Sequence, residues 1–176
     1  ETQAATLREE AANLPRIELS SKQACDLEMI AIGAFSPLTG YVGKADFDSI
    51  CNEMRLANGT VFPIPVTLAV DETVKGTLSE GGRAALHHAD GTLLAVMDVA
   101  ELYDHNRDIE MDGVFRTRDE AHPGVKAIMD EGDCLVGGDI HVLTVTPEHE
   151  PGEQFTEYRL APAATRAAFE AKGWST

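Results

Sequence analysis

The stretch from Cys25 to Gly59 most constrains the fold, because it holds two helical patterns joined by a short turn. In both patterns apolar residues recur every three or four positions, as they do on one face of an amphipathic helix. The first set is Leu27, Ile30, Ala31 and Ala34, and the second is Phe47, Ile50, Cys51 and Met54. On physical grounds alone, the stretch is a helix-turn-helix corner that packs within a globular domain.

The turn of this corner, Ser36-Pro37-Leu38-Thr39-Gly40, lies between two aromatic residues. Phe35 and Tyr41 can close it over the core, and its proline and glycine mark a defined backbone path. We expect Gly40 to adopt a positive φ, because a tight turn between two buried rings favours the left-handed region that glycine tolerates.

The periodicity before and within the corner predicts three helices and one short strand. A helical pattern covers Thr6–Ala12 and ends before Pro15, and Arg16–Leu19 is typical of a strand. Ser20 or Ser21 can cap the first helix of the corner, which ends near Gly33. We expect the second helix to run from about Lys44 to the left-handed pair Asn58-Gly59.

After Thr60 the pattern changes to that of strands joined by short turns, which favours antiparallel pairing. The Asp90-Gly91 turn between two such runs is a strong hairpin signal. Pro63 and Pro65 place the first run at a sheet edge or a bulge, and Gly137-Gly138 suggests a bulge or a close backbone approach in the last one. The strand-like runs are 61–70, 74–78, 83–88, 93–102 and 134–146; helices are expected at 108–115, 123–131 and 162–172, and 147–157 is expected to be an acidic loop. The expected fold class is therefore α+β.

The chain of 176 residues is long enough for one domain with a sizeable core, and it carries a formal charge of -16. Such an acidic surface repels phosphate backbones and anionic lipids, so nucleic acid and membranes are disfavoured as partners. No apolar run approaches the roughly 20 residues of a membrane span. With no leader pattern at its start, the chain is expected to be cytoplasmic.

The cysteine and histidine spacing does not predict a metal site. Cys25, Cys51 and Cys134 are odd in number and far apart, which is typical of reduced thiols in a cytoplasmic protein. No pair of Cys or His has the short spacing of a zinc site. His87 and His88 are adjacent, so in a strand they point to opposite faces.

Few residues are candidates for catalysis. The glycine-rich run GAFSPLTGYVG follows a helix rather than a strand and has no Lys-Ser or Lys-Thr after it, so it is a weak phosphate-loop signal. Ser36 is followed by proline and does not form a nucleophile elbow. Asp139 and His141 would share one face of a strand, where they are either a catalytic pair or partners in simple hydrogen bonds at the strand edge.

Several ordered motifs resemble those of the ATP sulfurylase (sulfate adenylyltransferase) family. They are GAFSPLTGY, EMRLANG, FPIPVTLAV, HPGV at His122–Val125, VGGDIHVL at Val136–Leu143 and RLAPAATRAAFEAKGW at Arg159–Trp174, and the resemblance runs from Leu14 onward. The sequence departs from the family pattern at Tyr41-Val42, where an aromatic residue and a methionine would be expected. The resemblance implies a PUA-like antiparallel β-barrel decorated with helices.

The resemblance also implies which part of the enzyme this chain represents. The family joins sulfate to the α-phosphate of Mg-ATP, giving adenylyl sulfate and pyrophosphate. Its nucleotide-binding motifs, a QTRNP-like run and a motif with two neighbouring histidines, lie in a later domain. Neither motif occurs in this sequence, whose adjacent His87 and His88 belong to the expected strand 83–88. The expected organisation is a PUA-like domain at 1–158, followed at 159–176 by a linker and the first helix of the catalytic domain.

No catalytic, cofactor-binding or metal-binding residue is therefore expected in this segment, and the segment alone is expected to be inactive. Its expected partners are the catalytic domain of the same enzyme, which is not part of this chain, and other copies in a homo-oligomer. The alternative is a stand-alone PUA-like interaction module. Because the chain is acidic and has no stripe of basic residues, RNA binding by such a module is disfavoured.

Overall fold

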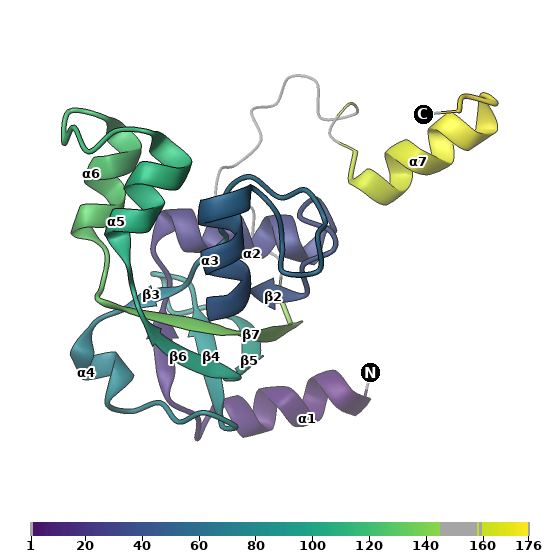
Figure 1. Ribbon diagram of the computed structural model, residues 1–176. Helices are drawn as coiled ribbons and strands as arrows, with labels where there is room; N and C mark the ends of the chain where they lie inside the picture. The colour runs from purple at the N-terminus through teal and green to yellow at the C-terminus, as the bar shows by residue number, and fades with distance from the viewer. Residues whose placement is uncertain (1, 145–157, 159, 176) are drawn as a thin grey trace.

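The computed structural model describes residues 2–144, 158 and 160–175, and a curled seven-stranded sheet lies at its centre (Figure 1). The described part forms seven α-helices and one π-helix. The strands are β1 (Arg16–Glu18), β2 (Gly40–Tyr41), β3 (Ala69–Val70), β4 (Arg83–His87), β5 (Leu93–Asp98), β6 (Glu101–Asp104) and β7 (Cys134–Val142). The helices are α1 (Thr2–Ala11), α2 (Ser21–Ala31), α3 (Lys44–Glu53), α4 (Glu72–Lys75), α5 (Arg107–Glu110), the π-helix η1 (Met111–Phe115), α6 (Pro123–Asp130) and α7 (Pro162–Ala171).

The nine-residue strand β7 connects the two halves of the sheet. Its first half pairs with β6 and β3, and its second half pairs with β5 and β2. These pairs are antiparallel, as is the β4–β5 hairpin, but β1 pairs with β4 in the parallel direction. The antiparallel pairing predicted for the strands after Thr60 is confirmed. The sheet as a whole is mixed, however, and not the purely antiparallel sheet that the resemblance implied. In the sequence, α2 and α3 lie between β1 and β4. No short turn therefore forces β1 to run antiparallel to β4, and it can pair with that strand in the parallel direction.

The hairpin predicted at Asp90-Gly91 is confirmed. Gly91 has φ +91°, and the Asp90 side chain accepts a hydrogen bond from the Thr92 backbone N–H at 2.8 Å. The two strands that it joins are buried on both faces. Leu86 and Met97 belong to the core cluster that includes α2 residues, and Val96 belongs to a separate cluster that includes α1 residues. This double burial explains why the β5 sequence is almost continuously apolar.

Helix ends follow the sequence closely at α2. Ser20 is the N-cap: its side chain accepts a hydrogen bond from the Gln23 backbone N–H, and the Gln23 side chain accepts one from the Ser20 N–H. This capping box settles the choice between Ser20 and Ser21. Gly33 follows the helix with φ +77°, as predicted.

Between residues 44 and 78 two predictions are wrong, and a third is confirmed in position but not in length. The helix that begins at Lys44 ends at Glu53, and Met54 takes the left-handed position with φ +55°. In the run 61–70 only Ala69–Val70 form a strand, β3, and it lies at an edge of the sheet beside β7, as the prolines predict. Val61 makes an isolated bridge with Arg55, so the strand is much shorter than expected. Residues 74–78, expected as a strand, lie partly in α4, where the Asp71 side chain caps the helix through the Val74 N–H at 2.8 Å.

The remaining boundaries differ less. The run 93–102 is split into β5, which pairs with residues 140–142 of β7, and β6, which pairs with residues 134–137. The predicted loop 147–157 and the end of the predicted strand 134–146 lie outside the described residues. No residue of α7 is buried.

All three cysteines are free thiols, and burial raises the pKa of Cys51 to about 12. In the described ranges no helix is long and apolar enough to cross a membrane.

Candidate functional site: a carboxylate-lined cleft where the motifs meet

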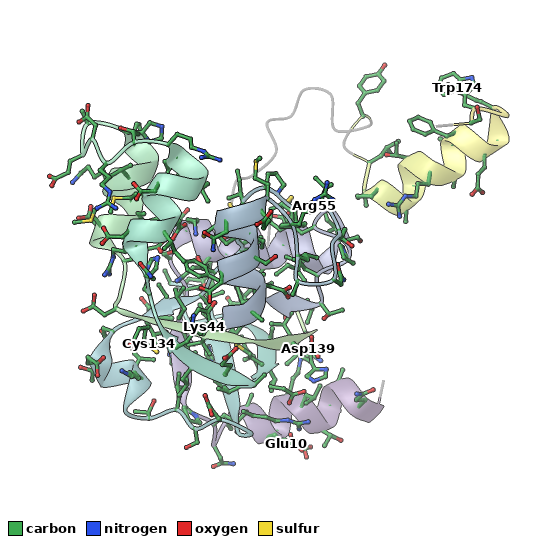
Figure 2. The ribbon with its side chains drawn as sticks, viewed as in Figure 1. Glu10, Lys44, Arg55, Cys134, Asp139 and Trp174 are labelled. Carbon is green, nitrogen blue, oxygen red and sulfur yellow. The ribbon has the colours of Figure 1, made fainter. Side chains whose placement is uncertain are left out.

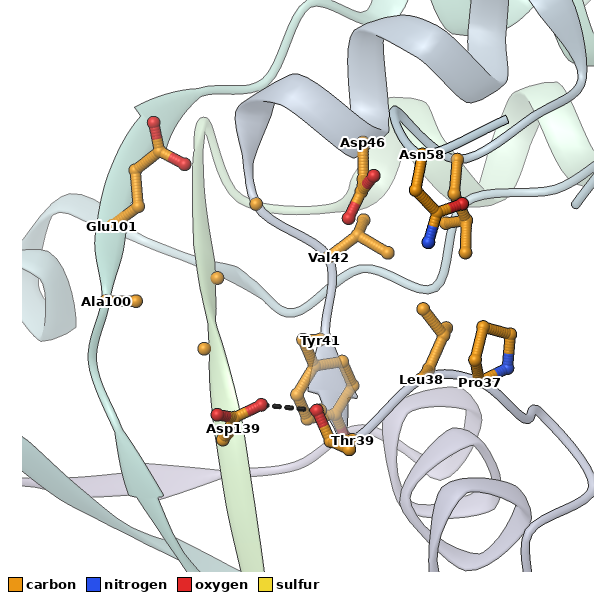
Figure 3. A pocket seen from close by; sticks show the side chains of 15 residues that line it. Pro37, Leu38, Thr39, Tyr41, Val42, Asp46, Asn58, Ala100, Glu101 and Asp139 are labelled. Atoms are coloured by element: carbon orange, nitrogen blue, oxygen red, sulfur yellow. Dashed lines mark hydrogen bonds between the residues drawn. The ribbon is translucent and has the colours of Figure 1, made fainter. Parts of the chain in front are cut away.

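Three of the sequence motifs meet at one open cleft of about 330 Å³, which we call the motif cleft (Figure 3). The segments come from the turn and β2, from the loop after α3, and from the middle of β7. The lining residues are Pro37, Leu38, Thr39, Gly40, Tyr41, Val42, Gly43, Asp46, Leu56, Asn58, Ala100, Glu101, Gly137, Gly138 and Asp139. Separate motifs thus assemble one site on the folded chain.

The floor of the cleft is a close crossing of two backbones. Gly40 pairs with Asp139, and Tyr41 pairs with Gly138. A Cβ on Gly40 would lie 1.9 Å from the Gly138 carbonyl oxygen, so no side chain fits there. The prediction of a positive φ at Gly40 is wrong, since the described residues with positive φ do not include it. Glycine is required here by the approach of β7 and not by the backbone angle.

The two adjacent glycines of β7, Gly137 and Gly138, also lie against neighbouring backbone with no room for a side chain. A Cβ on Gly137 would lie 2.7 Å from the Gly43 Cα, and one on Gly138 would lie 2.0 Å from the Asp98 carbonyl oxygen. Gly138 has φ +152°. The predicted close backbone approach at this double glycine is therefore confirmed.

Two buried tyrosines fix the cleft to the core. The Tyr41 hydroxyl donates to the Gln23 carbonyl oxygen at 2.7 Å, and the Tyr103 hydroxyl donates to the Val42 carbonyl oxygen at 2.7 Å. Burial raises the pKa of both hydroxyls well above its usual value, so both act as neutral donors. These two bonds hold the carboxyl-terminal end of β2, at Tyr41 and at Val42, which follows it.

Three carboxylates line the cleft, and each already accepts a hydrogen bond from the chain. Asp139 accepts from the Thr39 hydroxyl, Glu101 accepts from the Lys44 backbone N–H at 2.8 Å, and Asp46 accepts from the Ala57 backbone N–H at 2.8 Å. No lysine, arginine or histidine is among the described lining residues. The cleft is therefore a negatively charged surface whose carboxylates hold its own loops together.

The arginine of the EMRLANG motif, Arg55, does not line the cleft. Arg55 is exposed, and its guanidinium donates to the Gly59 carbonyl oxygen at 2.9 Å (Figure 2). It stabilises the loop that carries Leu56 and Asn58 to the cleft wall. Asp46 and Glu101 were missed by sequence reasoning. Asp46 could have been found from its place in the first turn of a helix. Glu101 could not, because it comes from β6, which is far away in the sequence.

The structure does not pair Asp139 with His141. The His141 imidazole lies 2.7 Å from the Asp98 carboxylate, whereas Asp139 is bonded to Thr39. Asp98 also accepts from Arg83, and the pKa of Asp98 is lowered mainly by its bond to His141. Of the two interpretations of these residues, the arrangement matches simple hydrogen bonds and not a catalytic pair, although the strand that carries them is central and not at an edge.

The other sequence candidates are also engaged locally. The Ser36 hydroxyl donates to the Gly33 carbonyl oxygen at 2.7 Å. A ring nitrogen of His87 lies 3.1 Å from the Gly91 carbonyl oxygen, and His88 lies 3.1 Å from the Asp90 carboxylate. Within residues 2–144 and 158–175, so far as they are described, no group of three His, Cys, Asp or Glu side chains could hold a metal ion.

Comparison with known proteins gives the context of this site. A family model described as PUA-like domain matches residues 1–145. A sulfate adenylyltransferase of Symbiobacterium thermophilum is 45% identical over 168 residues, covering 96% of this chain and 42% of that protein. One of Nostoc punctiforme is 44% identical over 163 residues, covering 93% and 41%. A probable bifunctional SAT/APS kinase 2 of Sorangium cellulosum is 42% identical over 170 residues, covering 97% and 29%.

A solved structure is similar as well. The hexameric APS kinase from Thiobacillus denitrificans superimposes with a TM-score of 0.69 at 25% identity, covering 98% of this chain and 29% of that chain. In each of these comparisons the chain spans less than half the length of the other protein.

Proposed function

Because the chain belongs to the PUA-like domain family, we propose that it is the amino-terminal domain of a sulfate adenylyltransferase and serves that enzyme as a structural and assembly domain. In this proposal the complete enzyme is a nucleotidyltransferase that forms adenylyl sulfate and pyrophosphate from Mg-ATP and sulfate. The relatives named sulfate adenylyltransferase support the enzyme, and their greater length supports a further catalytic segment.

The charge of the motif cleft is the observation that supports a non-catalytic role. ATP, sulfate and pyrophosphate are anions, and their transfer requires cationic groups and amide donors around the phosphates. The cleft offers Asp46, Glu101 and Asp139 instead, with no basic side chain among its described lining residues. Such a surface suits contact with a basic protein segment better than contact with a nucleotide.

The carboxyl-terminal segment supports a domain boundary near residue 158. No residue of α7 is buried, and Leu160 and Trp174 are each 54% exposed. Phe169 and Trp174 contact each other with ring centroids 5.5 Å apart. We propose that α7 packs on the catalytic segment, where burying such large apolar side chains is favourable.

We also propose a cytoplasmic homo-oligomer. The neighbour from Thiobacillus denitrificans is named as hexameric, which supports assembly into several copies, and the three free thiols fit a reducing compartment. We propose further that the curled mixed sheet described above belongs to a closed β-barrel, which is the form expected of a PUA-like domain. RNA binding is disfavoured by the formal charge of -16.

The proposal is tested by assaying the chain itself for pyrophosphate release from Mg-ATP and sulfate. The expected result is no release above that of a mock purification from the same host. Release that grows with added chain, and that survives repurification, would overturn the structural role. A coding sequence that continues beyond residue 176 into a QTRNP-like motif is expected, and a gene without one would favour the stand-alone interaction module.

A further inference from the structure

A second pocket, which we call the FPIP pocket, lies away from the motif cleft and has a different character. Its volume is about 320 Å³, and its walls are Phe35, Phe62, Pro63, Ile64, Pro65 and Val66, with Lys22 and Asp26 at one end. Phe35 and Phe62 are in edge-to-face contact with ring centroids 6.3 Å apart. Ile64 is 59% exposed at its rim. This volume is at the lower limit of pockets that hold small ligands, so the space suits one side chain better than a nucleotide.

The polar end of the pocket has more negative than positive charge. The Lys22 ammonium lies 3.6 Å from Asp26 Oδ2 and 3.4 Å from Glu131 Oε1, so one cation serves two carboxylates. Asp26 Oδ2 and Glu131 Oε2 are both buried, and neither has a hydrogen-bond partner among the residues that the structure describes. A buried carboxylate oxygen without a donor costs folding free energy. These two oxygens therefore lack N–H donors, and the cluster keeps one uncompensated negative charge.

The side chain that would suit this pocket can be described by its chemistry. It must carry a positive charge, it must offer several N–H donors to more than one oxygen, and it must bring an apolar stem for the aromatic and proline walls. A guanidinium has five N–H donors in a planar fork and stacks on aromatic rings, whereas an ammonium is a compact point charge. Lys22 already supplies an ammonium and does not satisfy the two oxygens. Its side chain is 47% exposed, so it has room to move aside.

We propose that the FPIP pocket binds an arginine side chain presented by another polypeptide segment, with its stem on Phe35 and Phe62 and its guanidinium on Asp26. The charge of the pocket supports this occupant, because one arginine would neutralise the excess carboxylate. Apolar residues next to that arginine would cover Ile64. The site is independent of the motif cleft and of the proposed enzyme context.

The proposal is tested by titrating the isotope-labelled chain with three capped amino acids at low ionic strength, and following the backbone amides of Phe35, Phe62 and Ile64 by NMR. The probes are N-acetyl-arginine amide, N-acetyl-lysine amide and N-acetyl-citrulline amide. Citrulline has nearly the shape of arginine but no charge. We expect saturable shifts with the arginine probe, and binding at least about tenfold weaker with the other two, because a charged hydrogen bond is lost.

Two variants and a matched control accompany the titration. Asp26→Asn is expected to weaken arginine binding about tenfold, and Ile64→Ser to weaken it less. The control is Asp130→Asn, which changes the net charge equally but alters an exposed ion pair with Lys126 at 3.3 Å, and its affinity should not change. Ile64→Ser alters an exposed residue, so it keeps the test valid if Asp26→Asn does not fold. No saturable shift with arginine, or equal binding of lysine or citrulline, would overturn the proposal.

Discussion

Gly40 is the residue on which the motif cleft depends most directly. A methyl group there would overlap the Gly138 carbonyl oxygen, at 1.9 Å from the Cβ position. We predict that Gly40→Ala lowers the free energy of unfolding by roughly 1–3 kcal/mol, as overpacking of a close contact does. The measurement is urea denaturation followed by circular dichroism.

The matched control for this substitution is Gly76→Ala. Gly76 has right-handed backbone angles, and a Cβ there would meet its nearest atoms at 3.4 and 3.5 Å. Its free energy of unfolding should change by no more than about 0.5 kcal/mol. If the two variants unfold at the same urea concentration as the unmodified chain, the close approach at Gly40 is not structurally important.

Asp26 should give the chain an unusual pH dependence. Burial raises its pKa above the ordinary value of 3.8, the Glu131 carboxylate raises it further, and Lys22 opposes both. The folded state therefore holds this proton more tightly than the unfolded state. The stabilisation is full below pH 3.8 and is lost as the pH rises through the folded pKa.

The test of this sign uses the difference between two proteins, because other carboxylates such as Asp98 have lowered pKa values and act in the opposite direction. Asp26→Asn cannot lose the proton, so we predict that its stability relative to the unmodified chain rises from acidic to neutral pH. Thermal melts across this range measure it. A relative stability that falls with rising pH would show that Asp26 is stabilised as a carboxylate.

At the scale of elements, Arg107 joins the start of α5 to the end of α6. Its guanidinium donates to the carbonyl oxygens of Ile128 at 2.7 Å and Gly132 at 3.1 Å and to the Asp133 carboxylate at 2.7 Å. The first two are carbonyls at and just after the end of α6, where helical partners run out. We predict that Arg107→Ala costs about 2–3 kcal/mol, because charged hydrogen bonds are lost and carbonyls are left without donors.

The control for Arg107 is Arg118→Ala. Arg118 bonds two carboxylates, Asp108 and Asp112, and its side chain is 52% exposed, where ion pairs contribute little. Chemical denaturation should therefore show a clearly smaller loss for this variant. Equal losses of unfolding free energy would mean that Arg107 stabilises the chain by its charge alone and not by its bonds to the carbonyl oxygens at the end of α6.

The elements whose signals are local could be predicted from the sequence. The capping box at Ser20, the Asp90-Gly91 hairpin and the proline that opens α6 each depend on a few neighbouring residues. The run 61–70 could not be predicted in the same way, because its β-rich composition is overridden by two prolines and by the edge that β7 offers. The parallel pairing of β1 with β4 is likewise set by tertiary packing.

The motif cleft was only partly visible in the sequence. The glycines and the turn were evident as a dense cluster, but their meeting with Asn58 and Glu101 depends on pairing between strands far apart in the chain. Asp139 and His141 lie two residues apart in one strand, as expected, yet each bonds a different partner, Thr39 and Asp98. Spacing places residues on a face but does not say which neighbour takes each hydrogen bond.

At the scale of the whole molecule, the charge is unevenly distributed along the chain. The segment 159–176 has three basic residues and one acidic residue, whereas the chain as a whole has a formal charge of -16. This segment also carries the exposed Leu160 and Trp174. We predict that a chain ending at residue 158 has the same free energy of unfolding as the longer chain, within about 0.5 kcal/mol.

Amide hydrogen exchange gives an independent measure of the same boundary. Amides of α7 should exchange rapidly, and those of β7 slowly, because the strand is central in the sheet and the helix buries no residue. Slow exchange throughout α7 in a monomeric sample, or a loss of several kcal/mol on truncation, would place the helix in the core of this domain.

The claim that this domain holds no nucleotide site is tested most directly by titrating Mg-ATP, and then sulfate, into the labelled chain. The motif cleft is followed through the backbone amides of Gly40, Gly43 and Gly138, which line it. Because the carboxylates there repel both anions, we predict no saturable shift of these amides at millimolar ligand. A saturable shift confined to the cleft, which Asp46→Asn or Glu101→Gln strengthens, would contradict the account and make the cleft an anion site.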